Sequence, residues 1–413
     1  MKYIVSFLIV TFCSTLFSQQ NQKILSLQDA INEALINNPV INQINAQIQG
    51  KKSEWRTVTG LYDPYITYSI DGVSDSKPET YDEQRITLNE EIDFPLTAFY
   101  RIKRVQNEKM SLEMKLNAEK RNTIAQVKMH YVEILYAKHL RELRIKEIKL
   151  LNELNSAINL KFETGFGNNM DKLNSEIRLA AAENKLNDAD ILLHEARYNL
   201  FSSIGLEPGN QSYEIEFADT LETGEKYIEQ EEALEQYEYH PRYKQALFMS
   251  NSAMYKIKEK RSEYIPGIKF GYFIQDFGTG YNHHGFEIGL TIPLWGLITQ
   301  QGEINMAKAN SIEIDWIQKE ILLDMKKQVE HAWHSYQNSK QTIENYNNRI
   351  KGKSDELIKL SAEAYKLGQI NLISYYEAQQ LYLSNNELYL DALKDYYLRL
   401  IELEQFIDKE LVY

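Results

Sequence analysis

Apolar and polar residues alternate in four short stretches of the chain, which form two pairs. The pairs lie at about 62–94 and 265–293, and a polar turn separates the two members of each. Strict alternation is the pattern of a β-strand with one apolar face, so two β-hairpins are predicted. The apolar positions of the second pair are Ile268, Phe270, Tyr272 and Ile274, followed by Phe286, Ile288, Leu290 and Ile292. In the first pair Glu90 lies among the apolar positions.

The pattern alone leaves two environments open for these hairpins. Strands of about 9–11 residues can cross a bilayer when tilted, and aromatic residues crowd the strand ends, as they do at the interfaces of membrane barrels. A soluble hairpin with one buried face would show the same alternation. In lipid, four strands cannot close a barrel, and open edges would leave backbone groups unpaired, so a membrane location would require several copies. Two copies would supply about eight strands and three about twelve.

Helical periodicity dominates the rest of the chain. One seam, spaced by three and four residues, consists of Ile148, Leu151, Leu154, Ile158 and Phe162. No proline occurs between Pro95 and Pro208, so we expect one helix over 97–163 and a returning helix over 169–205. A second helical hairpin is expected at about 297–411. A helix of about 67 residues rises about 100 Å, which excludes a compact domain and is typical of extended bundles and coiled coils.

Prolines recur at a spacing of about 200 residues, which indicates an internal duplication. The pairs are Pro39 with Pro241, Pro64 with Pro266, and Pro95 with Pro293, in the same order. A shorter helix opens each half, at 26–58 and 228–263, and the first proline of each half must break it, because proline lacks the amide donor. Ser26 is a plausible N-cap for the first of these helices. Each half therefore contains a broken helix, two strands and a long helical hairpin.

These features divide the chain into four segments. We predict a secretory signal peptide at 1–18, because Lys2 precedes an apolar run that ends at a small residue. Structural repeat one follows at 19–207, then a linker at 208–227 and structural repeat two at 228–413. No later stretch is apolar for 18 residues, so no membrane-spanning helix is predicted.

Composition removes several classes of protein. The net charge of −13 argues against a nucleic-acid partner, which requires a basic surface. The mean hydropathy of −0.48 is too low for a bundle of membrane-spanning helices. The single cysteine, Cys13, lies in the predicted signal peptide, which excludes a disulfide scaffold and a cysteine-based metal site.

The beginning of repeat one is similar to the opening signature of the TolC outer-membrane efflux family. The matching residues are Leu25, Ser26, Leu27, Gln28, Asp29, Ala30, Ile31, Ala34, Leu35, Asn38 and Pro39. The duplication, the hairpin positions and the two Phe/Tyr-x-x-Gly turns match as well. The resemblance implies a mostly α fold with a small β part, in which a homotrimer forms a 12-stranded barrel in the outer membrane, continued by a long α-helical barrel in the periplasm.

The resemblance also implies a function and partners. Family members are passive exit ducts of tripartite efflux or type I secretion systems, without a cofactor or catalysis of their own. They work with a periplasmic adaptor and an inner-membrane pump, and outer-membrane lipid surrounds the barrel. The alternative is an exported coiled-coil structural protein or adhesin stalk without a channel. We find no nucleotide-binding, metalloprotease or nucleophile motif that would favour an enzyme.

The turns between the long helices correspond to the adaptor-docking tips of the family. The tip residues are Thr164, Gly165, Phe166 and Gly167 in repeat one, and Leu367, Gly368, Gln369 and Ile370 in repeat two. Glycine suits such turns because it accepts a positive φ. We expect Phe166 and Ile370 to be exposed apolar anchors for the adaptor. Taken singly, each glycine is better interpreted as an ordinary helix end, but its recurrence after the same aromatic position in both repeats favours a functional tip.

The residues just beyond each tip correspond to the periplasmic gate of the family. Six and nine positions after the glycines lie Asp171 and Asn174 in repeat one, and Ser374 and Glu377 in repeat two. A ring of three Glu377 carboxylates would favour cations. Repeat two lacks the second acidic residue of some family members, and Ile370 stands where a basic residue is sometimes found. An ordinary solvated helix surface remains the alternative for Asp171 and Glu377.

Histidine pairs are the only candidates for a metal site. His331 and His334 share one helical face, and His283 and His284 lie in a predicted outer loop. No third ligand accompanies either pair in the sequence, so we assign no metal site.

Overall fold

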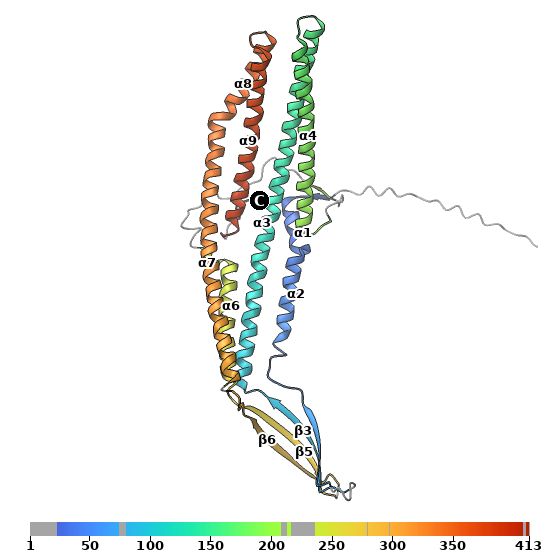
Figure 1. The fold of residues 1–413 in the computed structure, drawn as a ribbon, viewed down its shortest axis with the longest axis vertical. Coiled ribbons are helices and arrows are strands. Elements are labelled where there is room, and N and C mark those ends of the chain that lie inside the picture. Colours follow the sequence, from blue (N-terminus) through green and yellow to red (C-terminus); the bar gives the residue numbers. More distant parts are fainter. Residues whose placement is uncertain are drawn as a thin grey trace, which may run out of the picture.

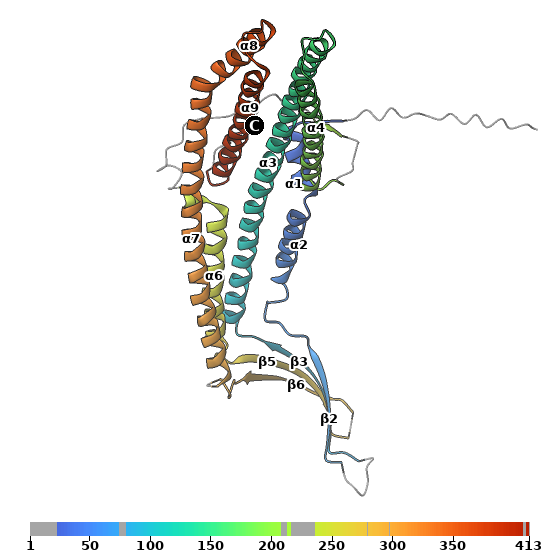
Figure 2. The same ribbon diagram turned by 45° about the horizontal axis from the view of Figure 1, so that its top comes forward.

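The computed structural model describes residues 23–73, 80–207, 213–215, 236–278, 280–296, 298–407 and 410–412. The predicted signal peptide at 1–18 lies outside the described residues, as does most of the predicted linker at 208–227. The described part is a long rod of helices with a small curved sheet at one end (Figures 1 and 2).

The sheet contains the four predicted strands in one antiparallel layer. β2 (Tyr65–Asp71), β3 (Glu83–Ile92), β5 (Gly267–Asp276) and β6 (His283–Thr291) pair in the order β2-β3-β5-β6. The two hairpins of the duplicated halves therefore lie side by side, joined through β3 and β5. β2 and β6 are the edges of this sheet.

The register separates an apolar face of the sheet from a polar one. Ile66, Leu88, Tyr272 and Phe286 form one cross-strand row on the apolar face. The neighbouring rows on this face include Tyr68, Ile86, Ile274, Phe270, Ile288, Ile92, Ile268 and Leu290. Phe286 is 81% exposed and Ile288 is 77% exposed, so this face is uncovered within one protomer. Glu90, as expected, lies on the same face, in a row with Phe270 and Ile288.

Ion pairs and hydrogen bonds link the strands across the polar face. Arg85 Nη1 donates to Glu287 Oε1 at 2.7 Å, and its guanidinium lies 4.0 Å from the ring centre of Phe273. Thr291 Oγ1 donates to Glu91 at 2.9 Å, and Lys269 Nζ lies 3.5 Å from the same carboxylate. The two faces of the sheet thus differ sharply in polarity.

The long helices lie where the sequence predicts them. α3 (Pro95–Glu163) runs unbroken for 69 residues, about 100 Å, and α4 (Asn169–Ser203) returns along it. The absence of internal proline and glycine from α3 permits this length, and Pro95 sits at its first turn, where its missing amide costs nothing.

The second helical hairpin differs from the first in one respect that the sequence does not predict. α7 (Thr299–Tyr346) is followed by a π-helical turn (Asn347–Lys351) and then by α8 (Gly352–Lys366). The ascending arm therefore bends at this turn, as Figure 2 shows between α7 and α8. α9 (Leu372–Glu404) returns toward the middle of the rod.

Shorter helices occupy the half of the rod nearer the sheet and its middle. α1 (Leu27–Asn37) and α2 (Pro39–Glu54) are separate helices, and α6 (Pro241–Ser262) begins at its proline. In repeat one the predicted break falls at Pro39 itself. In repeat two the predicted helix before Pro241 lies largely outside the described residues, and its described part, Gln236–Tyr239, is a 3-10 turn. The Ser26 side chain accepts a hydrogen bond from the Asp29 amide at 3.2 Å, which confirms it as the N-cap of α1.

Smaller elements complete the described chain. A single 3-10 turn (Gln236–Tyr239) precedes α6. Two three-residue strands, β1 (Lys23–Leu25) and β4 (Tyr213–Ile215), pair in parallel, which joins the start of repeat one to the region of the predicted linker.

Two apolar clusters hold the helices together. The larger lies at mid-height, where α1, α3, α4, α7 and α9 meet, and it includes Tyr131, Phe201, Tyr336, Leu400 and Val412. The smaller joins the two hairpins nearer their tips, and it includes Leu151, Ile158, Tyr375, Tyr376 and Leu383. Four residues of the apolar seam predicted on α3, from Ile148 to Ile158, belong to this smaller cluster, whereas the fifth, Phe162, is exposed and lies outside it.

A buried ammonium group ties the C-terminal segment to the middle of α3. Lys128 is fully buried, and its Nζ lies 2.5 Å from Glu404 Oε1 and 3.1 Å from Glu410 Oε1. The other Glu404 oxygen accepts hydrogen bonds from the amides of Leu411 and Val412 at 3.2 and 3.1 Å. One carboxylate thus pairs with the lysine and also caps the segment that follows α9.

Removing this lysine should destabilise the protein strongly. Lys128→Ala leaves the largely buried Glu404 without its countercharge, and breaking one partner of such a pair costs about 3–5 kcal/mol. The measurement is the free energy of unfolding from urea titration of the purified protein. Lys149→Ala, at an exposed position of the same helix, should change it by less than about 0.5 kcal/mol. Equal effects of the two variants would contradict the role given to Lys128.

His240 is held neutral at the start of α6. Its Nδ1 accepts from the Arg242 amide at 3.2 Å, and its Nε2 lies 3.2 Å from the carbonyl oxygen of Gln405, to which it donates. The ring also lies against Phe406, with the ring centres 5.9 Å apart. Burial lowers the pKa of His240 to about 4, and the positive charge of Arg121 acts in the same direction.

The stability of the protein should therefore fall on acidification. Because the folded-state pKa lies below the value of about 6.5 expected in the unfolded chain, the unfolded state binds more protons between about pH 6.5 and 4. The free energy of unfolding should fall by about 3 kcal/mol through this window from His240 alone. His240→Asn keeps an N-cap acceptor but does not titrate, so it should flatten the pH dependence of thermal unfolding. His194→Asn, at an exposed position, should leave the slope unchanged.

Candidate functional site

Both predicted tips end a helix in the same way. Gly165 has φ +79°, its amide donates to the Phe162 carbonyl, and the next amide, of Phe166, donates to the Lys161 carbonyl at 2.9 Å. In repeat two, Gly368 has φ +73°, and the same pair of hydrogen bonds closes the turn. This arrangement is a Schellman motif, which requires a residue that tolerates a positive φ at the glycine position. The glycines are therefore ordinary helix ends in their geometry, and both place an exposed turn at the extremity of the rod.

The exposed apolar residues of the tips differ from the expectation in one case. Phe166 is 90% exposed, as predicted. Ile370 is not an exposed anchor, because it is half-buried against the smaller apolar cluster. Leu367 takes its place, with 73% of its surface exposed. Each tip thus presents one large apolar side chain to solvent. In repeat one it is Phe166, directly after Gly165, and in repeat two it is Leu367, directly before Gly368.

The remaining tip residues shape the turns. Thr164 Oγ1 donates to the Leu160 carbonyl at 2.8 Å, which caps the last turn of α3. Gly167 allows the chain to cross close to Phe162, since a Cβ atom there would lie 2.5 Å from the Phe162 nitrogen. Gln369 is exposed.

The four gate candidates are not brought together within one protomer. Asn174, Ser374 and Glu377 are exposed, whereas Asp171 is half-buried in the first turn of α4. Among the described residues, no hydrogen bond or ion pair joins any two of these four side chains. A gate built from them would need further copies of the chain.

Asp171 does act across the gap between the two hairpins. Burial chiefly raises the pKa of Tyr365 on α8, and the Asp171 carboxylate raises it further. Asp171 also raises the pKa of Tyr376 of α9, where burial is again the main cause, while the Ser175 side chain and the charge of Arg178 oppose the increase. This half of the predicted gate therefore faces tyrosines, which the sequence did not indicate.

Cation–aromatic contacts link the hairpins along the same stretch. The Arg178 guanidinium of α4 lies 4.0 Å from the ring centre of Tyr376, and Lys161 Nζ of α3 lies 4.6 Å from that of Tyr365. Further down, Lys146 Nζ donates to the Tyr382 hydroxyl at 3.0 Å. Each contact of this type contributes about 0.5–1 kcal/mol at exposed sites. Together they form a set of inter-hairpin contacts, defined by Lys146, Lys161 and Arg178 with their tyrosines.

The sequence contained a weak signal for these contacts. The chain has 28 tyrosines, many of them in the last two helices, a distribution that fits helix seams and interface belts. Their basic partners lie about 200 residues earlier, so only the duplication hints that the two sets meet. Pairing across that separation depends on the packing of α3 and α4 against α9.

The histidine pairs remain without a ligand set. His283 lies against Phe277 and His334 against Trp333, with ring centres 5.2 and 5.0 Å apart. Among the described residues, no three His, Cys, Asp or Glu side chains are grouped closely enough to hold a metal ion.

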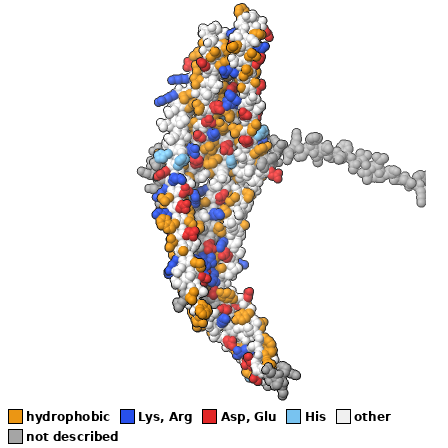
Figure 3. Space-filling model, in the orientation of Figure 1, with side chains coloured by type: hydrophobic (Ala, Val, Ile, Leu, Met, Phe, Trp, Pro, Cys, Tyr) orange, Lys and Arg blue, Asp and Glu red, His pale blue; other side chains and the backbone are white. Residues whose placement is uncertain are grey.

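The visible surface of the rod mixes acidic, basic and apolar side chains without a single-sign patch (Figure 3). In the described part of the chain, no helix has the length and apolar character needed to cross a bilayer.

Several solved structures are similar to this chain in fold. A membrane protein from Pseudomonas aeruginosa aligns over 94% of this chain and 95% of its own, with a TM-score of 0.80 and 15% identity. The outer membrane protein VceC from Vibrio cholerae aligns over 92% and 95%, with a TM-score of 0.80 and 14% identity. The open state of the MtrE outer membrane channel from Neisseria gonorrhoeae aligns over 92% and 88%, with a TM-score of 0.76 and 17% identity.

These likenesses define the fold class of the chain. No protein-family model and no curated protein matches the sequence. The structural likeness covers 92–94% of the chain, so the chain has the fold of these solved outer-membrane proteins. The predicted fold class, mostly α with a small four-stranded β part, is confirmed.

Proposed function

We propose that three copies of this chain form an outer-membrane exit duct that carries solutes from the periplasm to the exterior. The observation that carries the proposal is the sheet, which has one uncovered apolar face and two edge strands, β2 and β6. In lipid such edges would leave backbone groups unpaired at several kcal/mol each, and pairing β6 of one copy with β2 of the next removes both edges. Three copies give about twelve strands, a closed barrel in which the polar face lines the interior.

The dimensions of the sheet suit an outer membrane. The ten residues of β3 extend about 33 Å, enough to cross an apolar band of about 25 Å when tilted. Trp295, 74% exposed, and Phe99, 50% exposed, lie at the helical end of the sheet, where an aromatic girdle would be expected. The fold shared with the channels OprN, CmeC and MtrE supports the same location.

The helical rods would then enclose a tunnel that reaches into the periplasm. In this arrangement Phe166 and Leu367 lie at its far end, six apolar side chains in a trimer, available to an adaptor protein. An inner-membrane pump of an efflux or type I secretion system would supply the energy. The duct itself would be passive, without catalysis of its own.

The gate would lie just inside the tips. Three copies would bring the Asp171 and Glu377 carboxylates, with Asn174 and Ser374, around a narrow pore, where clustered like charges favour cations. The inter-hairpin contacts of Arg178 with Tyr376 and Lys161 with Tyr365 would hold the hairpins of each protomer together. Opening would separate them, a rearrangement of about 1–2 kcal/mol per protomer that adaptor binding could drive.

Electron microscopy of the detergent-extracted particle tests the duct directly. We expect a three-fold tube with a detergent belt around the sheet and a helical barrel about 100 Å long, and steps of conductance when the particle is added to a planar bilayer. A water-soluble rod without a belt and without conductance would overturn the proposal, and an exported coiled-coil stalk or adhesin would take its place.

Polar substitution at the two tips tests the docking assignment. Phe166→Ser with Leu367→Ser should abolish export, because the adaptor loses its exposed anchors, while trimers and bilayer conductance stay intact. Export can be measured in cells that lack the chain, complemented with each variant, from growth inhibition by a panel of antibiotics, detergents and metal ions. Thr164→Ser with Gln369→Ser is the matched control at the same tips, and it should export normally. Normal export by the first variant would remove Phe166 and Leu367 from the docking surface.

A further inference from the structure

A cavity of about 560 Å³ lies in the half of the helical rod nearer the sheet. Residues of four helices line it, from Lys51 on α2 to Asn310 on α7. The helices form a row in which α2 contacts α3, α3 contacts α6 and α6 contacts α7. Because residues from both ends of the row reach one cavity, the row curves around it. In a closed tube the concave side of each wall faces the axis, so the cavity faces the tunnel.

The lining of this cavity is basic, although the chain as a whole carries a net charge of −13. Four cationic side chains and one carboxylate contribute to it, namely Lys51, Arg104, Lys115, Lys256 and Glu108. Glu54 and Glu259, outside the lining, form ion pairs with Lys51, Arg104 and Lys256, so the excess of positive charge in this region is centred on Lys115. Lys115 is exposed, and within the described residues it has no hydrogen bond or ion pair.

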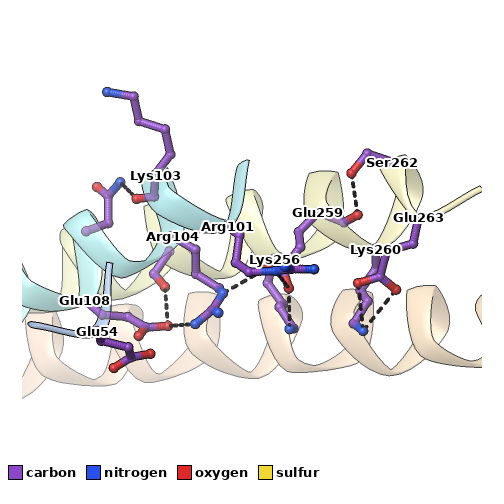
Figure 4. Close-up of polar contacts among 12 residues, drawn as sticks. Glu54, Arg101, Lys103, Arg104, Glu108, Lys256, Glu259, Lys260, Ser262 and Glu263 are labelled. Atoms are coloured by element: carbon purple, nitrogen blue, oxygen red, sulfur yellow. Dashed lines mark hydrogen bonds and ion pairs between the residues drawn. The ribbon is translucent and has the colours of Figure 1, made fainter. Parts of the chain in front are cut away.

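A buried carboxylate behind the lining holds the cationic groups in place (Figure 4). Glu259 is 3% exposed, and it accepts from Arg104 Nε at 2.7 Å and from Lys256 Nζ at 3.0 Å. Burial alone would raise the pKa of Glu259, but its hydrogen bonds with Arg104 and Lys256 lower it, so the carboxylate is ionised. Arg104 Nη1 also donates to Glu108 at 2.8 Å, and Lys51 donates to the same carboxylate at 2.6 Å. The cationic heads are thus fixed before any ligand arrives, which lowers the entropic cost of binding.

The rest of the lining is largely apolar. Leu112, Met249 and Ile314 contribute aliphatic surface from three different helices. Ser252 Oγ is already engaged, because it donates to Glu108 at 3.2 Å. A volume of this size is typical of sites for small organic molecules, and cationic groups beside an apolar wall select an anion that carries an apolar body.

We propose that this cavity binds amphipathic organic anions, a phosphate, sulfonate or carboxylate on an apolar body, as they pass along the tunnel. The inference rests on the proposed function, because the tunnel-facing position follows from the closed tube. Three such sites would form a basic zone between the acidic gate and the barrel. The gate would control entry into the tunnel, and this zone would favour anionic cargo over cationic cargo further along.

Binding of matched short-chain probes tests the proposal. Octyl phosphate, octyltrimethylammonium and octanol, each below its micelle concentration, are titrated into the full chain in a neutral detergent by isothermal titration calorimetry. We expect octyl phosphate to bind at least tenfold more tightly than the other two. Lys115→Gln with Lys256→Gln should weaken octyl phosphate at least tenfold, whereas Lys109→Gln with Lys258→Gln, on the same helices outside the lining, should leave it unchanged.

Two results would overturn the site. Equal affinities of the wild type and the Lys115→Gln, Lys256→Gln variant would remove the cavity from binding. If that variant does not fold, Lys115→Gln alone, at an exposed side chain, should still weaken octyl phosphate at least threefold, and no change would have the same meaning. Mass spectrometry of the extracted chain separates the two sources of phosphate, since a retained phospholipid that octyl phosphate displaces would assign the site to a lipid headgroup instead of cargo.

Failure of this inference is distinguishable from failure of the duct. In planar bilayers with a salt gradient, the Lys115→Gln, Lys256→Gln variant should shift the reversal potential toward cation selectivity, and octyl phosphate should block the wild-type current more strongly than the variant current. A conducting trimer that shows neither difference would overturn the anion site alone. A chain that forms no trimer and carries no current would overturn the tunnel position of the cavity together with the duct.

Discussion

Unpaired backbone groups along the edges of the sheet constrain the rest of the structure. Within the described part of one protomer, β2 and β6 each have a strand partner on one side only, and the apolar face between them is uncovered. Such edges are a liability in water and are excluded from lipid, so the fold is incomplete as a single chain. The duplication supplies a solution, because joining β3 to β5 fuses two hairpins into one layer and leaves only two edges for each protomer to satisfy.

The same incompleteness extends into the helical rod. A single layer of helices has little interior, and the apolar core is therefore concentrated where layers meet, around Tyr131, Phe201 and Tyr336 at mid-height. Elsewhere buried ion pairs, rather than apolar contacts, link neighbouring segments. Lys128 fixes the C-terminal segment at mid-height, while Glu259 pairs with three cations, Arg101, Arg104 and Lys256, between α3 and α6 near the sheet. Such buried charges tolerate no loss of a partner, so they specify one packing of the helices rather than adding much stability.

Most of the architecture could be predicted from the sequence because it rests on local patterns. Alternation located the strands, the long stretches without proline located α3 and α4, and the spacing of the prolines revealed the duplication. The π-helical turn at Asn347–Lys351 has no comparable signal, since an extra residue in a helical turn leaves the composition unchanged. Ile370 was assigned to the surface from its position after Gly368, but it packs against the apolar cluster that joins the two hairpins, which is formed by tertiary contacts. The contacts of Arg178 and Glu259 could not be predicted from the sequence for the same reason, because their partners are fixed by tertiary packing.

The π-helical turn gives the two repeats unequal mechanics. α3 is a continuous helix from the sheet to the first tip. The corresponding stretch of repeat two is divided into α7 and α8 by the π-helical turn. Such turns are frequent at hinges in helices. In a ring of three chains, the stiff helical hairpin of repeat one and the more flexible hairpin of repeat two would alternate around the circumference. A torque applied at the periplasmic end would then bend mainly the three hairpins of repeat two, while the three hairpins of repeat one would keep the tube straight. The aperture would therefore widen with three-fold rather than six-fold symmetry.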